Sequence, residues 1–461
     1  MSVTGRTSAT TEAPRFHAWE TTRRRVLGVL AAVVPLVIAE QSVGAKRAKR
    51  CNRKTANCNR LEAGACLFKC DFSGQTIDVS SLSKADMRKA SFINATLTRP
   101  SLRRANLAKA QLRGADLGGV YAVQADFTSA DLESASLEGA TLTNSDFSQA
   151  VLVNASLVDV DASSTKMVSV DFTTSDLSGA NLRRAVLTNA LVVAATVVDA
   201  DFTDADLRGA VFTSSDLAGA ILTGANIAGA NLTAADVTGV VSGRLVGQPS
   251  ALPAETGVVN GYLLGPGFDL SGATFAGESL TGLNLTDANL SNTNFTGADL
   301  SGTNLTGANL TGANFFEATL TGATLVGANL TGADFRDTVL DDADLSGATC
   351  TRTTFSGASA RSATFASATV ANAVFDGADL TNAVMTGLTG SGGSATDAVA
   401  TGALFTNSTL QTWNFNNAGL AGANFTSAVL TDSTFLGANL TGTIYCNTTM
   451  PNGNINNIGC P

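Results

Sequence analysis

The sequence predicts an all-β protein built as a parallel β-helix with four-sided coils. A large apolar residue returns at every fifth position over most of the 461-residue chain, and an alanine usually stands two residues before it. In the C-terminal half, phenylalanine recurs every twenty residues. A period of five fits neither an α-helix, which repeats about every 3.6 residues, nor a continuous strand, in which side chains alternate.

Each pentapeptide is expected to form one side and one corner of a coil. The alanine and the large residue lie two apart, as on one face of a strand. Between Leu270 and Gly347, the second residue after the large one is Gly in 11 of 16 cases and Asp or Asn in four more. These residues tolerate positive φ angles and turns, so the chain bends at each pentapeptide.

The phenylalanines set the number of sides. A spacing of twenty residues makes four pentapeptides per coil and places one ring above the next. Stacked coils would pair as parallel strands about 4.8 Å apart. Ala395 is the one gap in the predicted core column, which consists of Phe275, Phe295, Phe315, Phe335, Phe355, Phe375, Phe415 and Phe435.

Two repeat frames divide the chain. In the first, from Leu82 to Val237, 30 of 32 positions are large and apolar, and the second runs from Leu270 to Tyr445 with a three-residue slip in register. We therefore expect two stacked or linked blocks with cysteine-rich caps. The predicted segments are an export signal (1–45), an N-terminal cap (46–71), block 1 (72–240), a linker (241–268), block 2 (269–445) and a C-terminal cap (446–461).

Pentapeptides such as ANLTG at 308–312 and ADLSG at 343–347 resemble those of the pentapeptide-repeat family. The resemblance extends from Phe72 to Tyr445 and is to exported bacterial members with two repeat blocks. It implies a right-handed quadrilateral β-helix with the Leu, Phe and Ala positions inside.

The N-terminus is similar to a twin-arginine export signal. Arg23 and Arg24 follow Thr22, and the apolar run Val26–Ala39 of 14 residues is too short to span a bilayer comfortably. Small residues at 43–45 offer a cleavage site, and an uncleaved anchor is the alternative. The predicted location is exported, either secreted or associated with the cell surface.

Six cysteines lie near the two ends of the repeats. In an oxidising compartment they are expected to form disulfides, with Cys446 bonded to Cys460 and the four N-terminal cysteines in two pairs of open connectivity. Zinc is the competing interpretation, but the N-terminal spacing lacks the short pairs of zinc ribbons. The predicted disulfide cysteines are Cys51, Cys58, Cys66, Cys70, Cys446 and Cys460; Cys350 occupies a core position.

Charge is distributed unevenly. Residues 46–113 contain 16 Lys/Arg and 4 Asp/Glu, whereas residues 114–461 contain 8 and 31. Basic residues twenty apart would stack in adjacent coils, which predicts an anion-binding surface for wall polymers or lipid head groups. The alternative is a basic end that only aids export or solubility. Its candidate residues are Lys84, Arg88, Lys89, Arg103, Arg104, Lys109 and Arg113.

The sequence favours a non-enzymatic scaffold that presents flat faces to a protein or a cell-surface polymer. His17, the one histidine, lies in the predicted signal, which removes histidine bases and ligands from the mature chain. We expect no catalytic, cofactor-binding or metal-ligating residue and no small-molecule substrate.

Two other binding functions remain open. The acidic repeats are compatible with a DNA mimic, as in the family's quinolone-resistance members that bind DNA gyrase, although an export signal argues against it. Nucleic acid itself is not an expected partner. A third hypothesis is ice or crystal binding by a threonine array, which runs through Ser291, Thr311, Thr331 and Thr351 and ends at Ala371.

Overall fold

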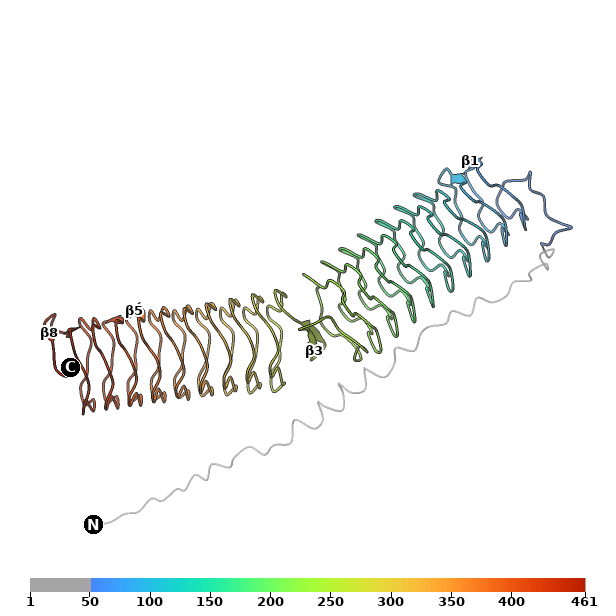
Figure 1. Cartoon of the computed structure of the whole chain (residues 1–461). Helices are drawn as coiled ribbons and strands as arrows, with labels where there is room; N and C mark the ends of the chain where they lie inside the picture. Colours follow the sequence, from blue (N-terminus) through green and yellow to red (C-terminus); the bar gives the residue numbers. More distant parts are fainter. Residues whose placement is uncertain (1–50, 461) are drawn as a thin grey trace, which may run out of the picture. The chain divides into compact units, whose positions relative to one another are not determined.

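The computed structural model describes residues 51–460, where the chain winds into successive coils (Figure 1). The predicted export signal, His17 and the basic residues before Cys51 lie outside the described residues. Parallel bridges join each coil to the next between residues twenty apart, at every fifth residue. One ladder runs from the Cys66–Asp86 bridge to Asn231–Ala251 and another from Asp269–Asn289 to Val429–Thr449. Each twenty-residue coil therefore has four bridged sides.

Few of these sides are long enough to count as strands, and no helix occurs between residues 51 and 460. Two strand pairs belong to the coils and are parallel: β1 (Thr76–Ile77) with β2 (Thr96–Leu97), and β5 (Thr389–Ser391) with β6 (Thr409–Gln411). Two pairs are antiparallel hairpins: β3 (Gly257–Val259) with β4 (Tyr262–Leu264), and β7 (Thr448–Thr449) with β8 (Ile455–Asn456).

The hydrogen bonds of one pentapeptide explain the corner. Leu305 N donates to Thr324 O at 2.6 Å and Gly307 N to Val326 O at 2.9 Å, so both bonds reach the following coil. Ala308 N closes the turn by donating to Leu305 O at 3.1 Å. Gly307, the third residue of this turn, has φ of 68°, a positive value that type II turns require. The corner therefore satisfies its own backbone while the two sides pair with a neighbouring coil.

The core is a continuous stack of apolar side chains inside the coils. Phe315 and Phe335 are fully buried, and their rings stack at 4.4 Å between centroids with an interplanar angle of 15°. Where a hydroxyl replaces the core alanine, it donates to a backbone carbonyl, either in the preceding coil, as Thr293 Oγ1 does to Leu270 O at 3.0 Å, or within its own turn, as Ser175 Oγ does to Phe172 O at 2.6 Å. Within residues 51–460, no buried side-chain nitrogen or oxygen lacks a partner.

The phenylalanine column continues from Phe275 to Phe375 and again from Phe415 to Phe435. Phe435 stacks on Phe415 at 5.0 Å but is only partly buried, because it lies near the end of the last coil. Phe435 is therefore the less buried end of the predicted column.

The gap at Ala395 is filled by a tryptophan. The Trp413 indole is buried and lies between Phe375 and Phe415, at 6.2 Å and 5.7 Å between ring centroids. Its Nε1 donates to Gly390 O at 3.2 Å. A Cβ at Gly393 would lie 2.4 Å from the indole, so the neighbouring coil needs glycine there. The repeat is thus degenerate in sequence here, while its core remains filled.

The segment between the two ladders carries the β3–β4 hairpin (Figure 1). Leu245 N donates to Gly261 O at 2.9 Å, which ties the hairpin to the residues before it. On the other side, the Tyr262 ring meets Phe275 edge-on at 5.4 Å, and Asn260 Nδ2 donates to Thr274 O at 2.8 Å. The hairpin therefore contacts residues of both ladders.

Phe316 follows the inward Phe315 in the chain. It is half-buried rather than exposed, and the Arg336 guanidinium lies 5.7 Å from its ring centroid. The cation covers the ring and is itself bonded to Asp334, with Nη2–Oδ2 at 2.6 Å. Truncation of Phe316 would therefore remove a contact between a cation and a ring.

Candidate anion-binding surface

All six predicted cysteines are paired in the structure. Disulfides join Cys51 to Cys66 and Cys58 to Cys70 at the N-terminal end, and Cys446 to Cys460 at the C-terminal end. The N-terminal pairs hold residues 51–65 to the first coils, where Asn57 N donates to Cys66 O at 2.9 Å.

Cys350 is the one free cysteine of the described residues, and it is buried. Loss of solvation raises the pKa of the Cys350 thiol to about 12. It therefore acts as a small apolar core residue and not as a nucleophile.

Arg88, a predicted anion-binding residue, is engaged within the protein. Its guanidinium forms two bonds with the Asp86 carboxylate, Nε–Oδ1 at 2.8 Å and Nη2–Oδ2 at 2.5 Å. Nη2 also donates to Cys51 O at 3.3 Å, and the group lies 5.7 Å from the Phe68 ring centroid. The hydrogen bond with Asp86 raises the pKa of Arg88. Arg88 therefore fixes the N-terminal segment to the first coil.

Arg113 is also neutralised. Its Nε bonds to Asp131 Oδ2 at 2.6 Å and its Nη1 lies 3.1 Å from Glu133 Oε2. The hydrogen bond with Asp131, followed by the charges of both carboxylates, raises the pKa of Arg113. The structure thus separates these two arginines from the other predicted residues.

The other five candidates are exposed and lack carboxylate partners within residues 51–460. Arg104 Nε donates to the neutral Gln124 Oε1 at 2.8 Å, and no ion pair involves Arg103. Of the seven candidates, those that keep an unpaired positive charge are Lys84, Lys89, Arg103, Arg104 and Lys109.

The unpaired cations concentrate at one backbone position. Six basic residues of the first coils occupy the corner that has positive φ, the place that the second block mostly fills with glycine. A long side chain in this conformation is unfavourable, so the backbone would prefer Gly or Asn. We call them the corner cations: Lys69 (φ 59°), Lys84 (58°), Lys89 (57°), Arg99 (50°), Arg104 (57°) and Lys109 (61°).

Lys69 was missed from the sequence. Lys69, Lys89 and Lys109 are each twenty residues apart. The same twenty-residue spacing that grouped the other lysines therefore also predicts Lys69. Lys69 precedes Leu82, the first position of the regular repeat frame. The structure brings these three lysines together along one groove with a volume of about 640 Å³.

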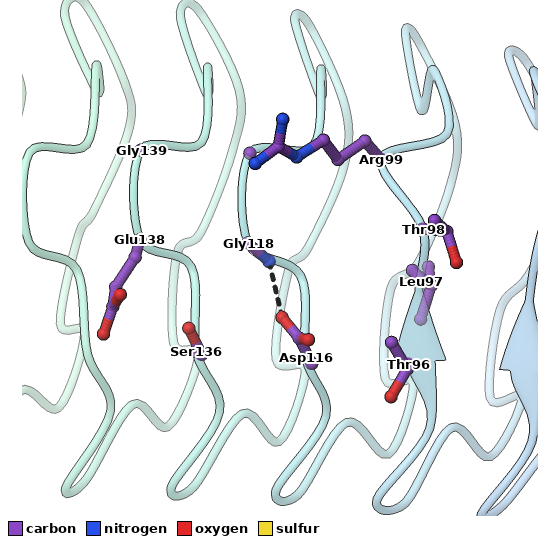
Figure 2. Close-up of a pocket in the computed structure, with 10 residues that line it drawn as sticks. Thr96, Leu97, Thr98, Arg99, Asp116, Gly118, Ser136, Glu138 and Gly139 are labelled. Atoms are coloured by element: carbon purple, nitrogen blue, oxygen red, sulfur yellow. Dashed lines mark hydrogen bonds between the residues drawn. The ribbon is translucent and has the colours of Figure 1, made fainter.

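A second depression, of about 750 Å³, surrounds Arg99. Figure 2 shows the Arg99 side chain reaching across the next coil above Gly118, and a Cβ at Gly119 would lie 3.0 Å from Arg99 Nε. Asp116 and Glu138 also line this depression, and Asp116 Oδ1 accepts from Gly118 N at 2.9 Å. One guanidinium and two carboxylates make it less suited to an anion than the lysine groove.

The acidic side chains of the later coils are used locally. Asp299 Oδ1 accepts from Ser301 N at 3.0 Å and Ser301 Oγ at 2.6 Å, and these bonds lower the pKa of Asp299. The threonine array is engaged in the same way, because Thr311 Oγ1 donates to Asn309 Oδ1 at 2.7 Å. Between residues 51 and 460, no group of three His, Cys, Asp or Glu is placed to hold a metal ion. No helix in that part is long and apolar enough to cross a membrane.

Comparison with known proteins identifies the family. A profile described as "Pentapeptide repeats (8 copies)" matches residues 80–190, 200–239, 269–370 and 414–444, more than half of the chain. The chain belongs to the pentapeptide-repeat family. Members of this family fold as right-handed β-helices and are generally non-enzymatic scaffolds.

Two solved structures are among the proteins similar to this chain. HetL, a pentapeptide-repeat protein involved in heterocyst differentiation regulation in the cyanobacterium Nostoc sp. strain PCC 7120, is 21% identical over 73% of this chain and 92% of its own, with a TM-score of 0.24. QnrB1, a plasmid-mediated fluoroquinolone resistance protein, is 17% identical over 37% of this chain and 82% of its own, with a TM-score of 0.22. No curated protein matches the chain.

Proposed function

We propose that this pentapeptide-repeat protein is an exported, non-enzymatic β-helical binding scaffold whose basic N-terminal end contacts an anionic cell surface. The observation that carries the proposal is the set of corner cations. These exposed lysines and arginines occupy a backbone conformation that costs folding energy, and no carboxylate within residues 51–460 neutralises them.

The corner cations are unfavourable for folding. A residue with an ordinary side chain in a sparsely populated backbone region costs of the order of 1–3 kcal/mol. Stacked like charges in neighbouring coils add repulsion. Glycine would relieve both penalties, as it does at Gly307 and Gly312 in block 2. Positive φ also occurs at Arg184 and Arg352 in later coils, so the feature that calls for a function is the grouping of like charges in neighbouring coils. Contact with an anionic surface is the simplest such function.

Export is supported by the disulfides and by the sequence of the first 45 residues. Three disulfides are typical of proteins that fold in an oxidising compartment. We further propose that the cysteine-rich ends are caps, with segments 46–71 and 446–461 covering the first and last coils of blocks 72–240 and 269–445. Caps would protect strand edges that could otherwise pair with another molecule.

The DNA-mimic alternative is less well supported by the charge pattern. A mimic of a duplex needs continuous lines of negative charge along the coils. Asp126, Asp146 and Asp206 lie in one column, but Lys166 and Val186 interrupt it. Lys166 Nζ lies 3.4 Å from Asp146 Oδ2 and partly neutralises it. The acidic coils would instead be repelled by an anionic surface, which leaves the N-terminal end as the region that contacts it.

Charge reversal tests the proposal. Replacing Lys84, Lys89, Arg104 and Lys109 with Glu in the full chain should abolish salt-sensitive binding to anionic vesicles and to cell-wall preparations. Wild type should bind at low salt and dissociate at high salt, because surface charges are screened.

The matched control reverses Arg184, Arg244 and Arg352, which also have positive φ, of 56°, 54° and 57°, and lie outside the basic coils. Binding should survive that change. Absence of wild-type binding at low salt, or equal loss in the control, would refute the proposal.

A further inference from the structure

The groove at the N-terminal end has lysines in one line. Lys69, Lys89 and Lys109 occupy the same corner of three successive coils, and the bridges Asp71–Ser91 and Ser91–Gln111 hold those coils in register. Successive coils are about 4.8 Å apart. The next corners of this column are the neutral Ser129 and Gln149, so the positive line ends after three coils.

The groove has a net positive charge. No ion pair joins any of the three ammonium groups to a carboxylate in the part of the chain that the structure describes. Asp71 is the one carboxylate that lines the groove, and its Oδ1 accepts from Ser73 N at 3.0 Å and Ser73 Oγ at 2.6 Å. The lysines therefore repel one another with little compensation from the protein.

Polar donors extend the line of charge. Ser73 Oγ and Ser91 Oγ lie 2.7 Å apart across two coils, and Gln111 lines the groove at the third. Lysine ammonium groups bind phosphate as point charges, and hydroxyl and amide groups donate hydrogen bonds to its oxygens. Ser73 Oγ already donates to Asp71 Oδ1 and is bonded to Ser91 Oγ, so the groove offers a ligand along the axis its three lysines and the Gln111 amide.

We propose that this groove binds a linear phosphate polymer, with successive phosphate groups beside Lys69, Lys89 and Lys109. The inference rests on the proposed function and names the ligand class. A line of cations in a groove fits a chain whose charges follow one another. A lipid surface would spread its charges in a plane and engage the separate corner column of Lys84 and Arg104 equally.

Titration of the full chain with labelled long-chain inorganic polyphosphate tests the groove. The variant replaces Lys69, Lys89 and Lys109 with Asn, which tolerates positive φ and should leave the thermal midpoint unchanged or higher. We expect at least a tenfold loss of affinity. The slope of log K against log salt should fall in magnitude by about 2. A flexible polyanion releases about 0.7 counterion per contact, and the variant removes three lysine contacts.

Two matched variants serve as controls. Arg184, Arg244 and Arg352 replaced with Asn should leave binding unchanged, and Lys84 and Arg104 replaced with Asn should weaken it less than the groove variant does. Inorganic monophosphate should compete poorly, since it contacts one lysine at a time. Equal competition by monophosphate or by polyglutamate would overturn the assignment of a phosphate polymer.

The outcomes distinguish the groove from the wider proposal. If polyphosphate does not bind while vesicles or wall preparations still do, the groove assignment is wrong and the proposed surface function stands. If the Lys84 and Arg104 variant loses as much affinity as the groove variant, a spread-out surface replaces the linear site. If none of the anionic probes binds, both proposals are wrong.

Discussion

Phe335→Ala is expected to lower the free energy of unfolding by about 3–5 kcal/mol, the usual cost of truncating a buried phenylalanine. Phe335 is fully buried and stacks on Phe315 at 4.4 Å and on Phe355 at 5.1 Å. Its removal would leave a cavity in the column and cost ring contacts on both sides. Denaturant unfolding of the two proteins measures the difference.

The matched control is Phe316→Ala, one residue farther along the chain. Phe316 is half-buried under Arg336. Its truncation removes a surface contact between a cation and a ring, together with the apolar area that the ring buries. The expected loss is about 1 kcal/mol. Equal losses at the two positions would mean that the inward register of block 2 is wrong.

Trp413→Ala is expected to cost a similar amount, about 3–5 kcal/mol. The indole fills the place that Ala395 leaves in the phenylalanine column and stacks between Phe375 and Phe415. Its loss would also leave the Gly390 carbonyl without its indole hydrogen bond. Denaturant unfolding checks the loss, and a cost below about 1 kcal/mol would contradict the filling role.

A double-mutant cycle with Gly393→Ala sharpens this test. A Cβ at Gly393 would lie 2.4 Å from the Trp413 ring, so Gly393→Ala should destabilise the wild-type chain. In the Trp413→Ala background the same methyl group meets open space and should cost little. A coupling energy near zero between the two positions would show that they do not meet in the core.

The repeat chemistry explains how much of this fold follows from the sequence. Membership of the pentapeptide-repeat family was predicted from the five-residue pattern and is confirmed. The pattern is readable because each large residue fills the same place in every coil, and the corner needs positive φ. Trp413 could not be predicted as a core filler, since it stands at a position that the pattern reserves for alanine.

The candidate site was less predictable, because charge count and spacing do not give side-chain partners. Arg88 and Arg113 lie in the basic coils by sequence, but the fold brings carboxylates within hydrogen-bonding distance of both. Lys69 has the same twenty-residue spacing as Lys89 and Lys109, but it lies before Leu82, where the regular repeat frame begins. Only the coil register shows that the three lysines line one groove.

Fractionation of the cells that make this protein tests the central claim most directly. The account predicts recovery in the cell-surface or secreted fraction, with surface-bound protein released by high salt and co-purifying with an anionic polymer. The four-residue charge-reversal variant should be exported and folded but absent from the surface. Recovery of the wild-type protein in the cytosol, bound to a DNA-binding protein such as gyrase, would contradict the account and favour the DNA-mimic alternative.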